Sequence, residues 1–206
     1  MTGGLDVPQN VKRLPTARGA NLSSPNAFAN AVMAQQVFGG HGYIAEWGVE
    51  QFVRDVRIAQ IYEGTNGVQA LDLLGRKVLR DGGTTADEFI ASMRADVNGV
   101  DAAYRDALET AIDRLADVTR QLLERAKHDP ALAGAASVDY LDLFALTAYA
   151  WLWARMATVA PRDAWGDAKR HTAAFFYARL LPRGMALAAA IGSDSATVTS
   201  MPADSF

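Results

Sequence analysis

The chain contains no cysteine among its 206 residues, so neither a disulfide framework nor a thiolate nucleophile or metal site can be built from it. Histidine is nearly as scarce. His41, His128 and His171 are scattered, without the i, i+4 pairing of a helical metal site, and we expect no metal site. Basic residues do not dominate, because the net charge is -3 and the isoelectric point is near 5.6. We therefore expect neither nucleic acid nor a membrane surface as a partner.

The start of the chain lacks the charged and then apolar order of a secretory signal, and we expect a cytoplasmic protein. One stretch, residues 141–160, is about as long as a membrane span. Asp142 and Arg155 lie inside it, and each would be costly at bilayer depth. We therefore expect this stretch to be a helix buried in the middle of a bundle.

Apolar residues recur with helical spacing along most of the chain, and alternating strand patterns are almost absent. One such stripe runs from Val49 to Val56 and a longer one from Tyr104 to Leu122. Between them lies a stripe that comprises Val68, Leu71, Leu74 and Val78. These patterns predict helices that each bury one face.

The helical spacing predicts an all-α fold, and the breaks in it divide the chain into three parts. Residues 1–26 are polar and aperiodic, and we expect an irregular leader. Residues 27–83 should form a first helical unit, which ends at a pair of glycines. Residues 84–206 should form a helical-bundle extension.

The most specific motif is Ile-Tyr-Glu-Gly-Thr, which places Glu63 at the end of an amphipathic helix. A carboxylate flanked by Ile61 and Tyr62 can be pressed into an apolar cleft, where desolvation raises its pKa and suits it to act as a general base. A solvated surface glutamate at a helix terminus is the alternative. Gly64 has no side chain and would let a substrate approach the backbone closely.

Two short segments could hold phosphate oxygens through backbone N–H groups. The first is a glycine-containing loop that comprises Gln36, Val37, Phe38, Gly39 and Gly40. A tight turn between helices is the alternative for it. The second begins a helix, where free N–H groups and the helix dipole favour an anion, and comprises Thr65, Asn66 and Gly67. An ordinary N-cap is the alternative there.

Together these motifs resemble the C-terminal signature of the flavin-dependent acyl-CoA dehydrogenases: Q, two variable positions, GGxGY, a helix with RD and R, and then IYEGT. The residues in register are Gln36, Gly39, Gly40, Gly42, Tyr43, Glu50, Arg54, Asp55, Arg57, Ile58, Ile61, Tyr62, Glu63, Gly64, Thr65 and Gln69. Residues 85–206 are similar to the helical C-terminal extension of a subset that includes dehydrogenases of methylthioalkanoyl-CoA thioesters.

The resemblance implies an FAD-dependent oxidoreductase of fatty acid metabolism. In that family the residue at the position of Glu63 removes the proton α to the thioester carbonyl while the β-carbon passes a hydride to the flavin, which yields a 2-enoyl-CoA. The backbone N–H of the same glutamate and a ribityl hydroxyl of the FAD hold the carbonyl oxygen. The segment at 36–40 contacts the FAD of a neighbouring subunit.

In that family an N-terminal helical domain and a central β domain supply most contacts to FAD and acyl-CoA, and neither has a counterpart here. We therefore expect a truncated or split enzyme that is not self-sufficient. Its expected partners are acyl-CoA and either further copies of itself or a complementary dehydrogenase polypeptide. The alternative is a non-catalytic helical interaction or oligomerisation module derived from the family.

Overall fold

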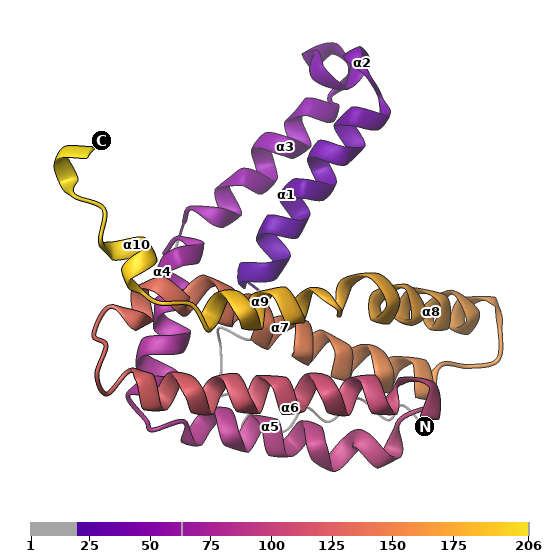
Figure 1. Ribbon diagram of the computed structural model, residues 1–206. Helices are drawn as coiled ribbons and strands as arrows, with labels where there is room; N and C mark the ends of the chain where they lie inside the picture. Colours follow the sequence, from indigo (N-terminus) through magenta and orange to yellow (C-terminus); the bar gives the residue numbers. More distant parts are fainter. Residues whose placement is uncertain (1–19, 63, 206) are drawn as a thin grey trace.

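The hydrophobic pattern folds into helices throughout. The computed structural model describes residues 20–62 and 64–205, with side chains from Ser24 onward, and within these ranges every regular element is helical (Figure 1). The all-α prediction is therefore confirmed. Most of the expected leader, residues 1–19, lies outside the described residues.

The first unit is a helical hairpin of α1 (Ala20–Val37) and α3 (Val49–Arg57). Its tip holds the single turn α2 (Gly40–Tyr43) and a 3₁₀ turn (Ala45–Trp47). Of the stripe predicted to be buried on α3, Val49 is buried and Val53 and Val56 are half-buried, but Phe52 is 64% exposed because only α1 packs along this helix. Figure 1 shows the hairpin as an arm that projects from the remaining helices.

The start of α1 corrects the predicted leader, because the helix begins at Ala20 and runs across the boundary placed after residue 26. Pro25 lies inside the helix. The preceding residues were expected to be irregular because they are polar and aperiodic, and Pro25 itself removes one intrahelical N–H bond. Packing of α1 against α3 offsets this loss, since the two helices contact each other along the arm.

The hairpin is joined to the bundle by α4 (Asn66–Leu71), which continues directly as a π-helix (Asp72–Leu79). A π turn holds more residues than an α turn, so it shifts the buried face along the sequence. Val68 and Leu71 were predicted to be buried, but they are 56% and 44% exposed. The buried side chains of α4 and this π-helix are those of Ala70, Leu73, Leu74 and Val78.

Five further helices form the bundle. They are α5 (Thr84–Asp96), α6 (Ala102–Arg125), α7 (Leu132–Val159), α8 (Ala164–Phe175) and α9 (Arg183–Ile191). A π-helical segment (Phe176–Leu180) joins α8 to α9, and a short α10 (Ala196–Thr199) follows. α7 contacts α4, α6, α8 and α9.

The stretch at 141–160 forms most of α7, and its core-facing side chains, such as Phe144 and Trp151, are buried among the other helices. Across the described part of the chain, no single helix has both the length and the hydrophobicity of a membrane span. Residues Ala164–Leu180 and Arg183–Ile191 reach those limits only as a pair, with a bend of 41° between them.

Two polar contacts connect α7 to its neighbours, one in the core and one at its margin. The Tyr140 and Thr119 hydroxyl oxygens lie 2.9 Å apart, and both residues are buried. Because the Thr119 hydroxyl donates to the carbonyl oxygen of Leu115, Tyr140 is the donor to Thr119. Burial raises the pKa of the Tyr140 hydroxyl, which therefore stays protonated. On α5, Asp96 Oδ2 accepts a hydrogen bond of 2.8 Å from Trp151 Nε1.

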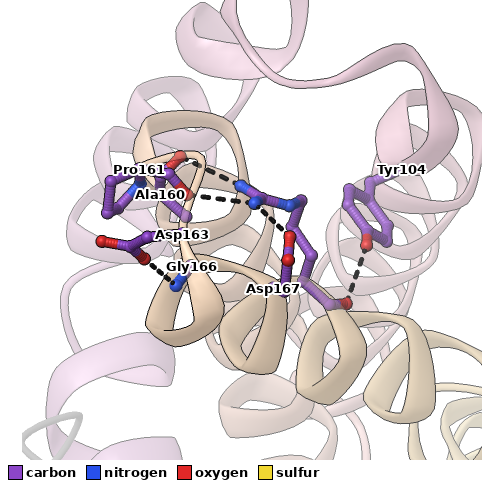
Figure 2. Close-up of polar contacts among 7 residues, drawn as sticks. Tyr104, Ala160, Pro161, Asp163, Gly166 and Asp167 are labelled. Carbon is purple, nitrogen blue, oxygen red and sulfur yellow. Dashed lines mark hydrogen bonds and ion pairs between the residues drawn. The ribbon is translucent and has the colours of Figure 1, made fainter.

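A set of hydrogen bonds around Ala160, Pro161 and Asp167 holds the turn between α7 and α8 (Figure 2). The Arg170 guanidinium donates to the carbonyl oxygens of Ala160 and Pro161, each at 3.0 Å, and to Asp167 at 2.7 Å. The Tyr104 hydroxyl of α6 donates in turn to the carbonyl oxygen of Arg170 at 3.3 Å. Carbonyl groups at the end of α7 thereby gain charged donors.

Gly166 is the position in this turn that admits no side chain. A Cβ there would lie 1.8 Å from the carbonyl oxygen of Pro161. We expect Gly166→Ala to destabilise the fold by roughly 1–3 kcal/mol, the usual cost of overpacking. Gly134→Ala is the matched control, because a Cβ at Gly134 in α7 meets nothing within 4 Å. Urea unfolding should show it neutral or stabilised by about 0.5–1 kcal/mol, and equal effects of the two changes would contradict the assignment.

Candidate functional site

The predicted loop at the hairpin tip is open to solvent. Gln36, Val37, Phe38, Gly39 and Gly40 are all exposed, and Val37 is 85% exposed. Gly39 adopts a φ of 59°, and a Cβ at Gly39 or Gly40 would meet nothing within 4 Å. A phosphate could therefore approach this backbone without obstruction.

The glycine that packing requires at the tip is Gly42, which was not among the predicted site residues. It is buried, and a Cβ there would lie 2.3 Å from the carbonyl oxygen of Gln35. The third glycine of the GGxGY pattern thus lets α2 pack onto the end of α1. Its place in that pattern is the sequence signal that could have identified it.

Glu63, the predicted base, lies outside the described residues. Its neighbours are described: the N–H groups of Ile61 and Tyr62 donate to the carbonyl oxygen of Ile58 at 2.9 and 3.1 Å, and Gly64 adopts a φ of 93°. Ile61 and Tyr62, expected to form an apolar cleft, are 49% and 53% exposed. These two side chains do not shield the turn from water, so desolvation of a base here requires a cover from outside the described residues.

The second predicted anion segment begins α4. Thr65 is its N-cap, and its Oγ1 accepts a hydrogen bond from the N–H of Val68 at 3.4 Å. Asn66 is the first residue of the helix, and Gly67 follows with no atom closer than 4.0 Å to a would-be Cβ. The role of Thr65 as an ordinary N-cap therefore explains why a threonine stands at position 65, while the backbone around Gly67 stays accessible.

Ser24, which was not predicted, holds the turn around position 63 from both sides. Gln60 Nε2 donates to the carbonyl oxygen of Ser24 at 3.3 Å, and Ser24 Oγ donates to Asn66 Oδ1 at 3.3 Å. Ser24 is only 6% exposed. No local pattern could reveal these contacts, because 36 and 42 residues separate the partners. The start of α1 thus positions the turn that carries the predicted base.

The polar side of α3 continues this support toward the tip. Arg57 donates to Gln60 Oε1 at 2.5 Å and lies over the Phe28 ring of α1, 5.9 Å from its centroid. Gln51 donates to Asp55 at 2.7 Å one turn earlier. These side chains contact one another and α1. The RD and R positions of the motif therefore have a structural role.

The tip and the base of the hairpin are not brought together. Figure 1 shows α2 at the free end of the arm and α4 where the arm meets the bundle. The 18 residues of α1 separate them by roughly 25 Å at the rise of an α-helix. Residues 36–40 and 65–67 therefore form two separate contact regions. Nowhere in the described ranges do three or more His, Cys, Asp or Glu residues form a group that could hold a metal ion.

A helical arm with GGxGY at its tip and IYEG at its base, mounted on an α-helical bundle, defines the C-terminal helical part of a dehydrogenase. Residues 85–202 match the family described as "Acetyl-CoA dehydrogenase C-terminal like", and residues 16–79 match "Acyl-CoA dehydrogenase, C-terminal domain". The chain belongs to the acyl-CoA dehydrogenase family and corresponds to the C-terminal portion of its members.

Two of the relatives match this chain over about two thirds or more of its length. The 3-methylmercaptopropionyl-CoA dehydrogenase of Ruegeria pomeroyi is 44% identical over 144 residues, which are 67% of this chain and 24% of the relative. The broad-specificity linear acyl-CoA dehydrogenase FadE5 of Mycobacterium tuberculosis is 30% identical over 167 residues, 76% of this chain and 27% of the relative. The chain thus spans about a quarter of the length of these relatives.

The anchoring of the turn can be tested without substrate. We expect Gln60→Ala to speed amide hydrogen exchange in residues 58–67 at least about fivefold, because its hydrogen bonds to Ser24 and from Arg57 are both lost and one such bond is worth about 1 kcal/mol. Gln51→Ala, which removes an exposed bond within α3, is the control and should leave that segment unchanged. Equal exchange in the two variants, measured by mass spectrometry, would show that Ser24 does not anchor the turn.

Proposed function

We propose that the chain supplies the base-bearing part of an FAD-dependent acyl-CoA dehydrogenase, which converts an acyl-CoA thioester into a 2-enoyl-CoA in the cytoplasm. The observation that carries the proposal is the turn at 61–65, whose motif matches the family and which hydrogen bonds fix to Ser24 on both sides. A base must be held in place relative to the carbon it deprotonates, and this anchoring supports that role.

Each residue of the turn has a distinct part in the proposed reaction. The Glu63 carboxylate takes the proton from the carbon α to the thioester carbonyl, and its backbone N–H donates to the carbonyl oxygen as negative charge develops there. Gly64, with its positive φ and no side chain, leaves room for the thioester beside the backbone. FAD, when bound, accepts the hydride that leaves the β-carbon.

The two backbone segments fit the phosphate portion of such a cofactor. The open backbone at 36–40 and the N-terminal turn of α4 at 65–67 could each meet anionic oxygens. Because they lie at opposite ends of the arm, we propose that they serve different FAD molecules in an assembly. The partners in that assembly are further copies of the chain or a complementary dehydrogenase polypeptide.

The large apolar surface that the arm exposes favours a second candidate function. Phe38, Tyr43 and Trp47 at the tip are 51%, 78% and 55% exposed. Such a surface also fits a non-catalytic helical module that keeps IYEGT by descent. The colour of the chain purified together with the missing dehydrogenase domains separates the two functions, because a flavin absorbance of that assembly supports the enzyme and a colourless folded assembly supports the module.

The base assignment predicts the effect of Glu63→Gln, which keeps the shape of the side chain and removes its basicity. In an assembly of this chain with the missing dehydrogenase domains, flavin reduction by acyl-CoA should slow by at least about 10²–10⁴-fold, the usual contribution of general base catalysis. Stopped-flow absorbance measures this rate. The control is Glu109→Gln, because Glu109 lies on the exposed side of α6. An assembly with this change should show a normal rate of flavin reduction. Near-normal reduction by Glu63→Gln would rule out the assignment.

The open geometry also predicts weak FAD binding by the isolated chain. Cofactor affinity depends on burial in a largely preformed cleft, whereas the two candidate segments are separate and face solvent. Titration followed by FAD fluorescence quenching should give a dissociation constant well above the micromolar range. Submicromolar binding by the 206-residue chain alone would show that it carries a complete flavin site.

A further inference from the structure

A cavity of about 220 Å³ lies at the end of the bundle where α5 turns into α6. The short 3₁₀ turn after α5 (Val97–Gly99) forms one side of it, and the last residues of α7 form the other. Figure 1 shows the α5–α6 and α7–α8 connections at the same end of the bundle, away from α4 and the arm. The cavity is therefore separate from the turn at 61–65, and its ligand does not depend on the proposed function.

Two opposite charges line this cavity without closing into a short hydrogen bond. Arg155 Nε lies 3.4 Å from Asp96 Oδ2, whereas charge-assisted hydrogen bonds measure about 2.7–2.9 Å. The exposed pair of Arg94 and Asp113, by contrast, is closed at 2.6 Å. The side chains of Arg155 and Asp96 are also the better shielded, at 22% and 39% exposure. The pair in the cavity therefore has room for a further polar group.

The other contacts of these side chains fix their orientation and leave particular atoms for a ligand. Trp151 Nε1 donates to Asp96 Oδ2 at 2.8 Å, and the Arg155 guanidinium lies over the Trp151 ring, 5.0 Å from its centroid. Neither terminal nitrogen of Arg155 forms a hydrogen bond with a residue in the described ranges, and neither does Asp96 Oδ1. Thr158 Oγ1 donates to one backbone carbonyl and accepts from one backbone N–H, each at 2.8 Å, so one lone pair remains on it.

We propose that this cavity binds a small zwitterion that carries an ammonium group beside a carboxylate and a short aliphatic chain, such as an aliphatic α-amino acid. The two terminal nitrogens of Arg155 donate side by side to the ligand carboxylate. The ligand ammonium donates to Asp96 Oδ1 and to Thr158 Oγ1. The aliphatic chain lies against Val100 and Val159, which line the same cavity.

The size and the charges of the cavity both select this class of ligand. Its volume lies below the roughly 300–1,000 Å³ typical of pockets for drug-sized ligands, so the ligand is small. A ligand with a carboxylate alone is attracted by Arg155 but repelled by Asp96, and a ligand with an ammonium alone meets the reverse. A zwitterion satisfies both side chains at once.

The test uses the full chain, isotope-labelled for NMR, and follows the indole N–H signal of Trp151, which is bonded directly to Asp96. Titration with L-leucine should move this signal and saturate with a dissociation constant on the order of 1 mM. Two matched probes each lack one charge of leucine: isocaproate has no ammonium, and isoamylamine has no carboxylate. Each should bind at least about tenfold more weakly, because one charge-assisted contact is lost.

Asp96→Asn tests the assignment of the charges, because its amide oxygen can still accept from Trp151. Without the carboxylate, the ligand ammonium loses its partner next to Arg155, so isocaproate should now bind more tightly than L-leucine. A purely structural ion pair would not give this reversal. The control is Asp113→Asn, which removes the partner of Arg94 outside the cavity and should leave L-leucine preferred.

Gly99→Leu tests the cavity without changing either charge, and it decides the question if Asp96→Asn does not fold. Gly99 lines the cavity, and a Cβ there would meet nothing within 4 Å, so the new side chain fills the space for the ligand. It should abolish the effect of L-leucine, whereas Gly134→Leu on α7 should not. A Trp151 signal that does not respond to L-leucine, or that moves equally with all three probes, would overturn the proposal. Unchanged binding of L-leucine by Gly99→Leu would overturn it as well.

Discussion

The burial of α7 is the constraint on which the rest of the bundle depends. Most of its 28 residues are apolar, so α4, α6, α8 and α9 must each present an apolar face to it. Its few charged residues stay at the margins of this contact. Asp142 is only half-buried, yet desolvation, with a smaller contribution from Asp139, raises the pKa of its carboxyl group. Arg155 lies over the Trp151 ring and pairs with Asp96 at 3.4 Å.

Through α4, the packing on α7 also fixes the position of the candidate site. The π-helix that continues α4 packs into the bundle through Leu73, Leu74 and Val78, and the turn before α4 is hydrogen-bonded to Ser24. A general base needs both a fixed position and a low-dielectric surrounding. Among the described residues, hydrogen bonds to Ser24 anchor Gln60 and Asn66 on either side of the motif, whereas the exposed Ile61 and Tyr62 provide no low-dielectric cover.

The sequence was sufficient to predict features that depend on local periodicity. The stripe from Tyr104 to Leu122 forms the buried face of α6, and the stretch at 141–160 is a core helix. Prediction failed where a local rule met a tertiary effect. The polar, aperiodic composition of residues 1–26 suggested an irregular leader, but α3 packs on α1 and the helix begins at Ala20 and extends through Pro25.

The remaining errors have equally specific causes. The π-helix after α4 breaks the 3.6-residue period, so Val68 and Leu71 are exposed where the stripe predicted burial. The support of the candidate site by Ser24 could not be read from sequence, because it joins residues that only the antiparallel packing of the arm brings together. The open flanks of the turn were missed because apolar residue types predict a cleft only when something covers them.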